Sequence, residues 1–424
     1  MSATDTDGRT IAELAADLRA GRTYAAALAE AAIANHEAGD ARFAAYKTWD
    51  PARFRAEAEV ADRALAVGID LGPLQGIPVS VKDLFGVRGY PTFAGAPREL
   101  PAVWRREGPV IRALRGQLAV VSGKTHTVQF AFGALGTNPH WGTPRNPWDA
   151  EAHRAPGGSS AGAGVSLWEG SALLALGTDT AGSVRMPASM TGTVGIKTTQ
   201  GRWSTDGITP LSHTLDTPGV LARNVADAAL AFSVIDPEAS GDPARFLAEI
   251  EGAEIGDFRI GVCEAFFASC DPGVAEGVHA ALAQLEAAGA RVSRVDIPGL
   301  DEVDQIFRSG GLSAHEFASF IQDEFARLPC GHRPDGGRAL RQDGSADRCR
   351  LSGPDTQDGG AVGGRPRGGG RRARRGRADG ADHATEDRRR CGAQGVSEGE
   401  PDGGAEHDDG EPAGDVCCDD PCGA

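Results

Sequence analysis

Three segments in the middle of the chain carry residues that could activate a nucleophile. The first, Gly-Ile-Pro-Val-Ser-Val-Lys82, places a lysine at the end of an apolar run. The second is Gly-Gly-Ser159-Ser-Ala-Gly, and the third is Gly-Thr-Asp-Thr-Ala-Gly-Ser183. Glycines beside a serine permit close backbone approach, so a hydroxyl can be presented where consecutive N–H groups converge. The pattern is compatible with a serine nucleophile and an oxyanion site.

Lysine is scarce in this protein, which has four lysines among its 43 basic residues. A desolvated ammonium can lose its proton, whereas a guanidinium effectively cannot, so a retained lysine suits the position of a base. On the local sequence alone, Lys82 could instead be a strand-end lysine paired with Asp83. The Gly-Gly-Ser-Ser motif also occurs in flexible linkers, but the apolar run at 171–176 between the two serine segments indicates folded core.

Together, in this order and at this spacing, the three segments resemble the amidase signature family of Ser-Ser-Lys amidohydrolases. Further blocks extend the resemblance over about residues 10–329, among them Gly142-Thr-Pro-Arg-Asn-Pro-Trp-Asp149 and Asp216-Thr-Pro-Gly219. The family implies an α/β fold with a mixed sheet core flanked by helices. It also implies hydrolysis of an amide to a carboxylate plus ammonia or an amine, through an acyl-enzyme.

The resemblance assigns a role to each residue of the triad. Ser183 would be the nucleophile, Ser159 the bridging serine and Lys82 the terminal base. The peptide bond between Gly158 and Ser159 would be cis. The oxyanion would be held by the N–H groups of Thr180, Ala181, Gly182 and Ser183.

Other residues near these segments have supporting or structural interpretations. Asp179 is expected to order the nucleophile turn by accepting backbone N–H bonds. Arg185 could bind a substrate carboxylate, although an ion pair that stabilises the fold is the more favoured interpretation. Three aromatic residues could line an acyl pocket or belong to the core, namely Phe130, Phe132 and Trp203.

The composition of the chain limits the kinds of binding partner that we expect. With a net charge of −16, a nucleic-acid-binding surface is not expected, so the predicted partner is a small-molecule amide. The sequence contains no apolar run of about 18 residues and begins with polar and acidic residues, so we expect no membrane span, no signal peptide and a cytoplasmic location. We expect no cofactor and no metal, because neither the histidines nor Cys417-Cys418-x3-Cys422 have a matching ligand set. A homodimer is left open.

The helices and strands that must position these residues are predicted from the spacing of apolar residues and from the residues that begin and end such elements. Residues 1–329 read as one amidase domain, which the family comparison suggests is incomplete at its C-terminal end. Thr23 is a plausible N-cap, and Asp271 with Pro272 would begin the helix that Gly289 ends. Helices are predicted at 11–19, 24–36, 51–66 and 272–288, and strands at 77–81, 118–121, 172–176, 259–262 and 291–295.

Composition changes near residue 329. Residues 330–424 contain 22 Gly and 15 Arg, but no Ile, Met, Phe, Trp, Tyr, Lys or Asn, so this segment cannot bury a core. It is predicted to be a disordered or frame-shifted low-complexity tail. Codons chosen freely for residues 376–384 can be read one base later as Asp-Ala-Leu-Thr-Ala-Pro-Thr-Thr-Pro, which resembles a family segment that the chain otherwise lacks. The coding DNA tests this hypothesis.

Two alternatives to a free-standing amidase follow from these features. One is the amidase subunit of a tRNA-dependent glutamyl amidotransferase, although that subunit usually has Gln where this chain has Met186 and a double Gly where it has Ala181-Gly182. The other is a catalytically impaired product of truncation or frameshift.

Overall fold

The structure is a computed structural model that describes residues 8–325, 338–340 and 346–348. The chain divides into two compact units, residues 1–352 and 353–424, and every described residue belongs to the first unit. The predicted low-complexity tail lies outside the described residues, except for two short antiparallel strands, β9 (Arg338–Leu340) and β10 (Ala346–Arg348). The domain boundary at residue 329 and the change of reading frame stay predictions.

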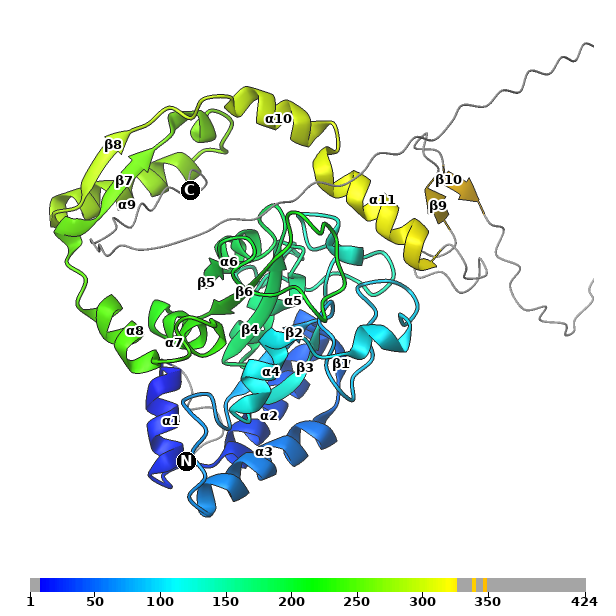
Figure 1. The fold of residues 1–424 in the computed structure, drawn as a ribbon, viewed down its shortest axis with the longest axis vertical. Helices are drawn as coiled ribbons and strands as arrows, with labels where there is room; N and C mark the ends of the chain where they lie inside the picture. The colour runs from blue at the N-terminus through cyan, green and yellow to red at the C-terminus, as the bar shows by residue number, and fades with distance from the viewer. Residues whose placement is uncertain (1–7, 326–337, 341–345, 349–424) are drawn as a thin grey trace, which may run out of the picture. The chain divides into compact units, whose positions relative to one another are not determined.

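A six-stranded mixed sheet with the strand order β1-β3-β2-β4-β6-β5 organises the first unit (Figure 1). Strand β2 runs parallel to both of its neighbours, β3 and β4, while the remaining pairs are antiparallel. The α/β class is therefore confirmed. The strands are β1 (Tyr46–Trp49), β2 (Pro78–Lys82), β3 (Val120–Thr125), β4 (Leu174–Asp179), β5 (Val194–Lys197) and β6 (Thr217–Ala222).

Helices pack against this sheet from several parts of the chain. Helix α5 (Ala161–Glu169) contacts β2, β3, β4 and β6, and helix α7 (Val225–Ile235) contacts β4, β5 and β6. No helix in the described part of the chain has both the length and the apolarity needed to cross a bilayer. The other helices are α1 (Ile11–Arg19), α2 (Ala25–Phe43), α3 (Pro51–Ala66), α4 (Pro109–Gly116), α6 (Arg185–Thr191), α8 (Pro243–Glu251), α9 (Val274–Ala288), α10 (Leu300–Arg308) and α11 (Gly311–Phe325).

The start of α2 differs from the prediction. Tyr24, not Thr23, occupies the N-cap position, and its side chain makes no capping bond. Asp62 on α3 takes that role, because its carboxylate accepts hydrogen bonds from the N–H groups of Ala25 at 2.6 Å and Ala26 at 2.9 Å. A contact between two helices has replaced a local cap, which sequence pattern alone does not reveal.

The predicted βαβ unit is present. Strands β7 (Arg259–Val262) and β8 (Arg291–Arg294) pair in parallel, and α9 connects them and ends at Gly289. The predicted start at Asp271 and Pro272 is wrong. Gly273 is the N-cap, with φ at +90°, and the Glu276 carboxylate accepts its N–H at 2.9 Å.

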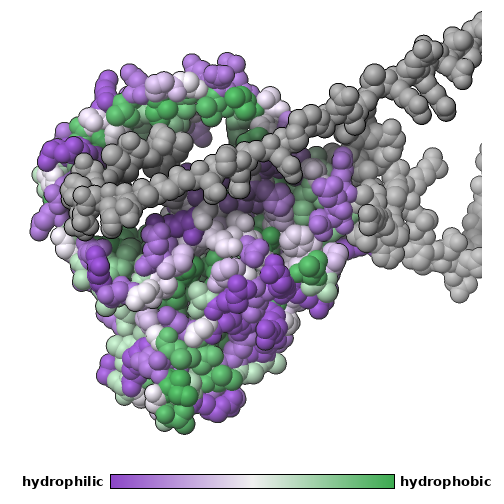
Figure 2. All heavy atoms as spheres, viewed as in Figure 1, coloured by the Kyte–Doolittle hydropathy of each residue, from purple (hydrophilic) through white to green (hydrophobic). Residues whose placement is uncertain are grey.

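The apolar stripe of α9 stays accessible. Val274, Val278 and Leu285 are 52%, 42% and 39% exposed, and Ile306 and Phe307 on α10 are 53% and 61% exposed. Figure 2 shows apolar surface along the stretch of β8 and α10. The buried core of the described residues therefore belongs to the six-stranded sheet and its helices, and that part of the molecule positions the site.

A buried ion pair stabilises the sheet next to the end of β2. Lys124 Nζ lies 2.8 Å from Asp83 Oδ1, and both side chains are fully buried. Burial raises the pKa of Asp83, and the Lys124 ammonium opposes that shift. Removing one partner of such a pair leaves an uncompensated charge in the protein interior.

We expect Lys124→Met to lower the free energy of unfolding by about 3–5 kcal/mol at pH 7, because Asp83 then lacks its cation. Urea denaturation followed by tryptophan fluorescence measures this change. The control is Arg245→Met, which breaks a pair between Arg245 and Glu249 whose side chains are 76% and 61% exposed. The control should cost about 0.5 kcal/mol or less. Equal losses in the two variants would contradict the prediction.

Candidate active site

The three segments that the sequence analysis singled out meet at the carboxyl ends of two parallel strands. Strand β2 ends at Lys82, and its neighbour β4 ends at Asp179. Parallel strands present their carboxyl ends at the same edge of a sheet, so Lys82 comes beside Thr178 and Asp179. Ser159 follows a glycine-rich loop directly before α5, and Ser183 lies in the turn between β4 and α6.

Lys82 is fully buried and has three polar contacts. Its Nζ lies 2.7 Å from Ser159 Oγ, 2.8 Å from Thr178 Oγ1 and 3.4 Å from the Thr178 carbonyl oxygen. Burial lowers the pKa of Lys82 to about 7, and the negative charges of Asp216 and Asp179 oppose this shift. At neutral pH a substantial fraction of the side chain is therefore an uncharged amine.

These three contacts can be made by an ammonium, which donates to all three oxygens, or by a neutral amine. A neutral amine has two N–H donors and one lone pair, and the Thr178 carbonyl oxygen can only accept. When the second N–H donates to Thr178 Oγ1, the lone pair is left for the Ser159 hydroxyl. In that state Ser159 Oγ donates its proton to Lys82 Nζ, which is the direction of transfer that a base requires.

The backbone around Ser159 is held by the loop that follows β3. The Gly158–Ser159 peptide bond is cis, as the family resemblance implies. The Ser159 carbonyl accepts hydrogen bonds from Thr127 Oγ1 at 3.0 Å and from the Val128 N–H at 3.1 Å. A Cβ atom at Gly158 would lie 2.5 Å from the backbone nitrogen of Gly136, so this position has no room for a side chain.

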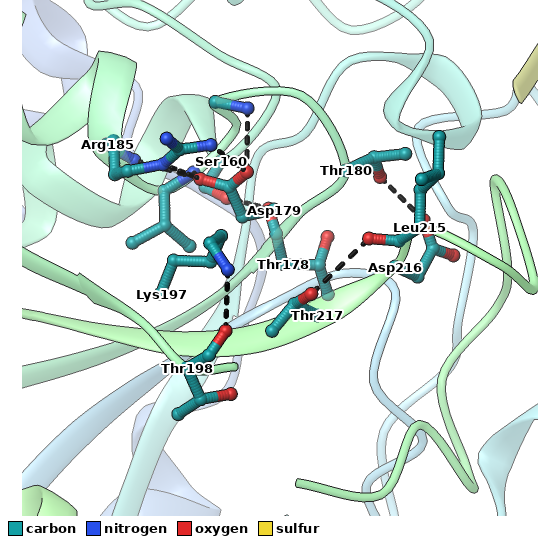
Figure 3. A network of polar contacts seen from close by, with 12 residues as sticks. Ser160, Thr178, Asp179, Thr180, Arg185, Lys197, Thr198, Leu215, Asp216 and Thr217 are labelled. Carbon is teal, nitrogen blue, oxygen red and sulfur yellow. Dashed lines mark hydrogen bonds and ion pairs between the residues drawn. The ribbon is translucent and has the colours of Figure 1, made fainter. Parts of the chain in front are cut away.

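The turn that carries Ser183 is organised by Asp179. Its carboxylate accepts the N–H groups of Gly182 at 2.6 Å and Val184 at 3.0 Å. The Arg185 guanidinium pairs with the same carboxylate, with Nη2 3.0 Å from Oδ1 and Nε 3.1 Å from Oδ2 (Figure 3). Burial favours the neutral acid, but Arg185 and the two N–H groups together hold the pKa of Asp179 below its usual value.

The same turn leaves some backbone donors available. Gly182 adopts φ at +114°, and its N–H is already bonded to Asp179. Within the described residues, the N–H groups of Thr180, Ala181 and Ser183 donate to no protein acceptor. The structure therefore narrows the four candidate oxyanion donors to these three.

The three aromatic candidates for an acyl pocket have different surroundings in the structure. Phe132 is 50% exposed, and its ring centroid lies 5.7 Å from that of Phe317 on α11. Phe130 is buried, and its ring centroid lies 5.3 Å from that of Phe317. Trp203 is a core residue, since it is 2% exposed and its Nε1 donates to Asp236 at 2.9 Å. Trp203 therefore belongs to the core and does not form the wall of a pocket beside the triad segments.

Three residues that sequence reasoning did not single out contact the site. Thr178 contacts Lys82, Thr127 holds Ser159, and Asp216 accepts a hydrogen bond from Thr180 Oγ1 at 2.5 Å. Thr178 could have been found from the strand pattern, because it precedes Asp179 at the end of β4. Among the described residues, no group of three or more His, Cys, Asp or Glu side chains is arranged to hold a metal ion.

His126 is buried, but it does not take part in the contacts of Lys82. Burial and, to a smaller extent, the nearby Lys47 charge lower the pKa of His126 to about 4, so the imidazole is neutral near pH 7.

Comparison with known proteins identifies the family of this chain. A family model described as Amidase matches residues 27–339. The chain is 54% identical over 317 residues to 2-amino-5-chloromuconic acid deaminase of Comamonas testosteroni, an alignment that covers 74% of this chain and 68% of that protein. It is 37% identical to a glutamyl-tRNA(Gln) amidotransferase subunit of Salinispora tropica, covering 70% of this chain and 62% of that relative.

A solved amidase structure superposes with a TM-score of 0.68 at 33% identity, covering 78% of this chain and 72% of that one. The matched family model spans most of the chain, and the relative from Comamonas is aligned over two thirds of its own length. This chain therefore belongs to the amidase family.

Proposed function

We propose that this protein hydrolyses a carbon–nitrogen bond through a Ser-Ser-Lys triad in which Ser183 is the nucleophile, Ser159 the proton relay and Lys82 the base. The observation that carries the proposal is the contact of 2.7 Å between the fully buried Lys82 Nζ and Ser159 Oγ. A buried lysine with a pKa near neutrality is the form of this side chain that can accept a proton.

The reaction begins when Lys82 accepts the proton of Ser159, while Ser159 accepts the proton of Ser183. The freed Ser183 oxygen attacks the substrate carbon and forms a C–O bond, and the electron pair of the C=O bond moves to the oxygen. The backbones of the two serine segments are tied together, because the Ser160 N–H donates to the Ser183 carbonyl at 3.2 Å. This contact links the loop of the proposed relay to the turn of the proposed nucleophile.

The negative oxygen of the intermediate is stabilised by N–H groups from Thr180, Ala181 and Ser183. One such donor contributes about 2.7–4 kcal/mol in comparable sites. The intermediate collapses by breaking the C–N bond, and Ser159 returns the proton to the leaving nitrogen. Water then attacks the acyl-enzyme by the same route and releases the acid and free Ser183. The products are a carboxylate and ammonia or an amine.

The substrate class is inferred from the relatives. The relative from Comamonas testosteroni carries a name that gives 2-amino-5-chloromuconic acid as its substrate and deamination as its reaction. Among the compared relatives its identity to this chain exceeds that of the amidotransferase subunits. We therefore place ammonia release from a small amide above the amidotransferase role, in which a partner protein receives the ammonia.

Ser183→Ala, Ser159→Ala and Lys82→Ala should each lower turnover by about a thousandfold or more, because the triad acts as a unit. The measurement is ammonia release from a panel of small amides, with fluorophosphonate labelling of Ser183 followed by mass spectrometry. Ser233→Ala is the matched control, since this buried serine lies in α7, where its hydroxyl donates to the Leu230 carbonyl, and its loss should leave the activity at the wild-type level. Glutaminase activity that requires a co-purifying partner would favour the amidotransferase role, and absence of labelling would indicate an impaired enzyme.

The pH dependence follows from the pKa of Lys82. Because the base must be uncharged and its pKa is about 7, kcat/KM should rise tenfold per pH unit below about pH 7 and level off above it. Lys82→Arg keeps the positive charge but cannot lose it, and should be inactive at every pH. A profile that is flat between about pH 5 and pH 8 would show that Lys82 is not the titrating base.

Thr178→Val should lower kcat/KM by about tenfold. The valine keeps the shape of threonine but removes an acceptor for the Lys82 N–H, which would then donate to Ser159 and block proton transfer in the required direction. Thr178→Ser retains the hydroxyl and should recover most of the activity. Wild-type kinetics in Thr178→Val would disprove this role for the hydroxyl.

A further inference from the structure

Asp216, in the loop directly before β6, is a buried carboxylate with only 8% exposure. Its Oδ1 accepts the Thr180 hydroxyl at 2.5 Å, and its Oδ2 accepts the N–H groups of Leu211 at 2.8 Å and Ser212 at 3.1 Å. In the part of the chain that the structure describes, no lysine or arginine forms an ion pair with it. A buried carboxylate with no paired cation is costly and calls for a functional explanation.

The hydroxyl that Asp216 binds belongs to the turn of the nucleophile. Thr180 follows Asp179 directly, and its N–H is one of the three available oxyanion donors. Asp179 holds the later residues of the turn, Gly182 and Val184, while Asp216 holds its first residue. Figure 3 places the two carboxylates on either side of Thr178. The turn is therefore fixed at both of its ends.

The charges of Asp216 and of the proposed base, Lys82, also influence each other. Its charge opposes the effect of burial on Lys82, and the Lys82 charge in turn opposes the effect of burial on Asp216. Burial is the larger effect on each group. Among the described residues, other charged groups near this loop include Asp179 with its partner Arg185 at the nucleophile turn, and Glu316 on α11.

Glu316 fixes the loop from its outer side. Its carboxylate accepts hydrogen bonds from the hydroxyl groups of Ser212 and Thr214, and from the Thr214 N–H at 3.1 Å. Burial favours the neutral acid, but the hydrogen bonds from Ser212 and Thr214 hold the pKa of Glu316 below its usual value. Asp216 thus has a defined position between α11 and the nucleophile turn.

From this geometry we propose that Asp216 is a positioning residue of the site, which holds the first oxyanion donor through the Thr180 hydroxyl and presents a negative charge to the Lys82 amine. The inference rests on the proposed function, since it assigns roles to the oxyanion turn and to Lys82. Two separable effects follow from it. One depends on the charge of Asp216, and the other depends on the hydrogen bond to Thr180.

The charge is tested with Asp216→Asn in the full chain, by the rate at which a fluorophosphonate probe labels Ser183 as a function of pH. Removing the negative charge lowers the pKa of Lys82, so the amine stays neutral to lower pH. The acidic limb of the pH profile should shift to lower pH by about half a unit or more.

Asp227→Asn is the matched control for charge removal. Asp227 is 2% exposed and accepts the Ile11 N–H at 2.7 Å and Asn224 Nδ2 at 2.8 Å, and burial raises its pKa as it does for Asp216. Its loss should leave the acidic limb in place. A limb that does not move in Asp216→Asn, or that moves equally in both variants, would overturn the proposal.

The hydrogen bond is tested with Thr180→Val, which keeps the Asp216 charge. The labelling rate should fall about tenfold at every pH while the limb stays where it is. If circular dichroism shows that Asp216→Asn does not fold, the Thr180→Val variant tests the proposal. A wild-type labelling rate in Thr180→Val overturns it. Failure of the wild-type protein to label at Ser183 would instead reject the proposed function itself.

Discussion

The burial of the Lys82 amine at the end of β2 is the constraint on which the site depends. A charged ammonium in this position would leave water without forming an ion pair, which is costly. The neutral amine fits because Ser159 and Thr178 supply partners for its lone pair and its two N–H groups. The parallel pairing of β2 with β4 brings Thr178 into range, so the chemistry of the amine depends on the topology of the sheet.

The two serine segments are close to this amine because their glycines exclude side chains. A Cβ atom at Gly158 would overlap the backbone of Gly136, and one at Gly182 would lie 2.9 Å from Met186 Cε in a backbone conformation that side chains disfavour. Asp179 accepts the N–H groups of Gly182 and Val184, so these two donors of the turn are already bonded. The glycines provide the room, and the carboxylate determines which N–H groups are available.

Sequence motifs point to the candidate triad residues, but they do not reveal most of the residues that hold those side chains in position. Lys82, Ser159 and Ser183 lie in short motifs whose order and spacing can be read directly, and the apolar runs around them predicted β2, β3 and β4 to within a few residues. Asp216 could not be assigned in this way, since it lies 36 residues from Thr180 and reaches it only when β6 pairs with β4. The Asp62 cap of α2 and the Asp236 partner of Trp203 were missed for the same reason. Both contacts join elements that are distant in sequence.

The opposition between burial and nearby carboxylates gives a physical reason for the pKa of Lys82. Burial alone would lower the pKa until the amine became a weak base, and the carboxylates alone would keep it protonated at neutral pH. A base works best when its pKa lies close to the working pH, because it is then both uncharged and still able to accept a proton. Arg185 partly neutralises Asp179. The charge of Asp216 therefore opposes the effect of burial on the Lys82 pKa more strongly. On this argument, the charge of Asp216 supports the proposed base alongside the contact between Lys82 and Ser159.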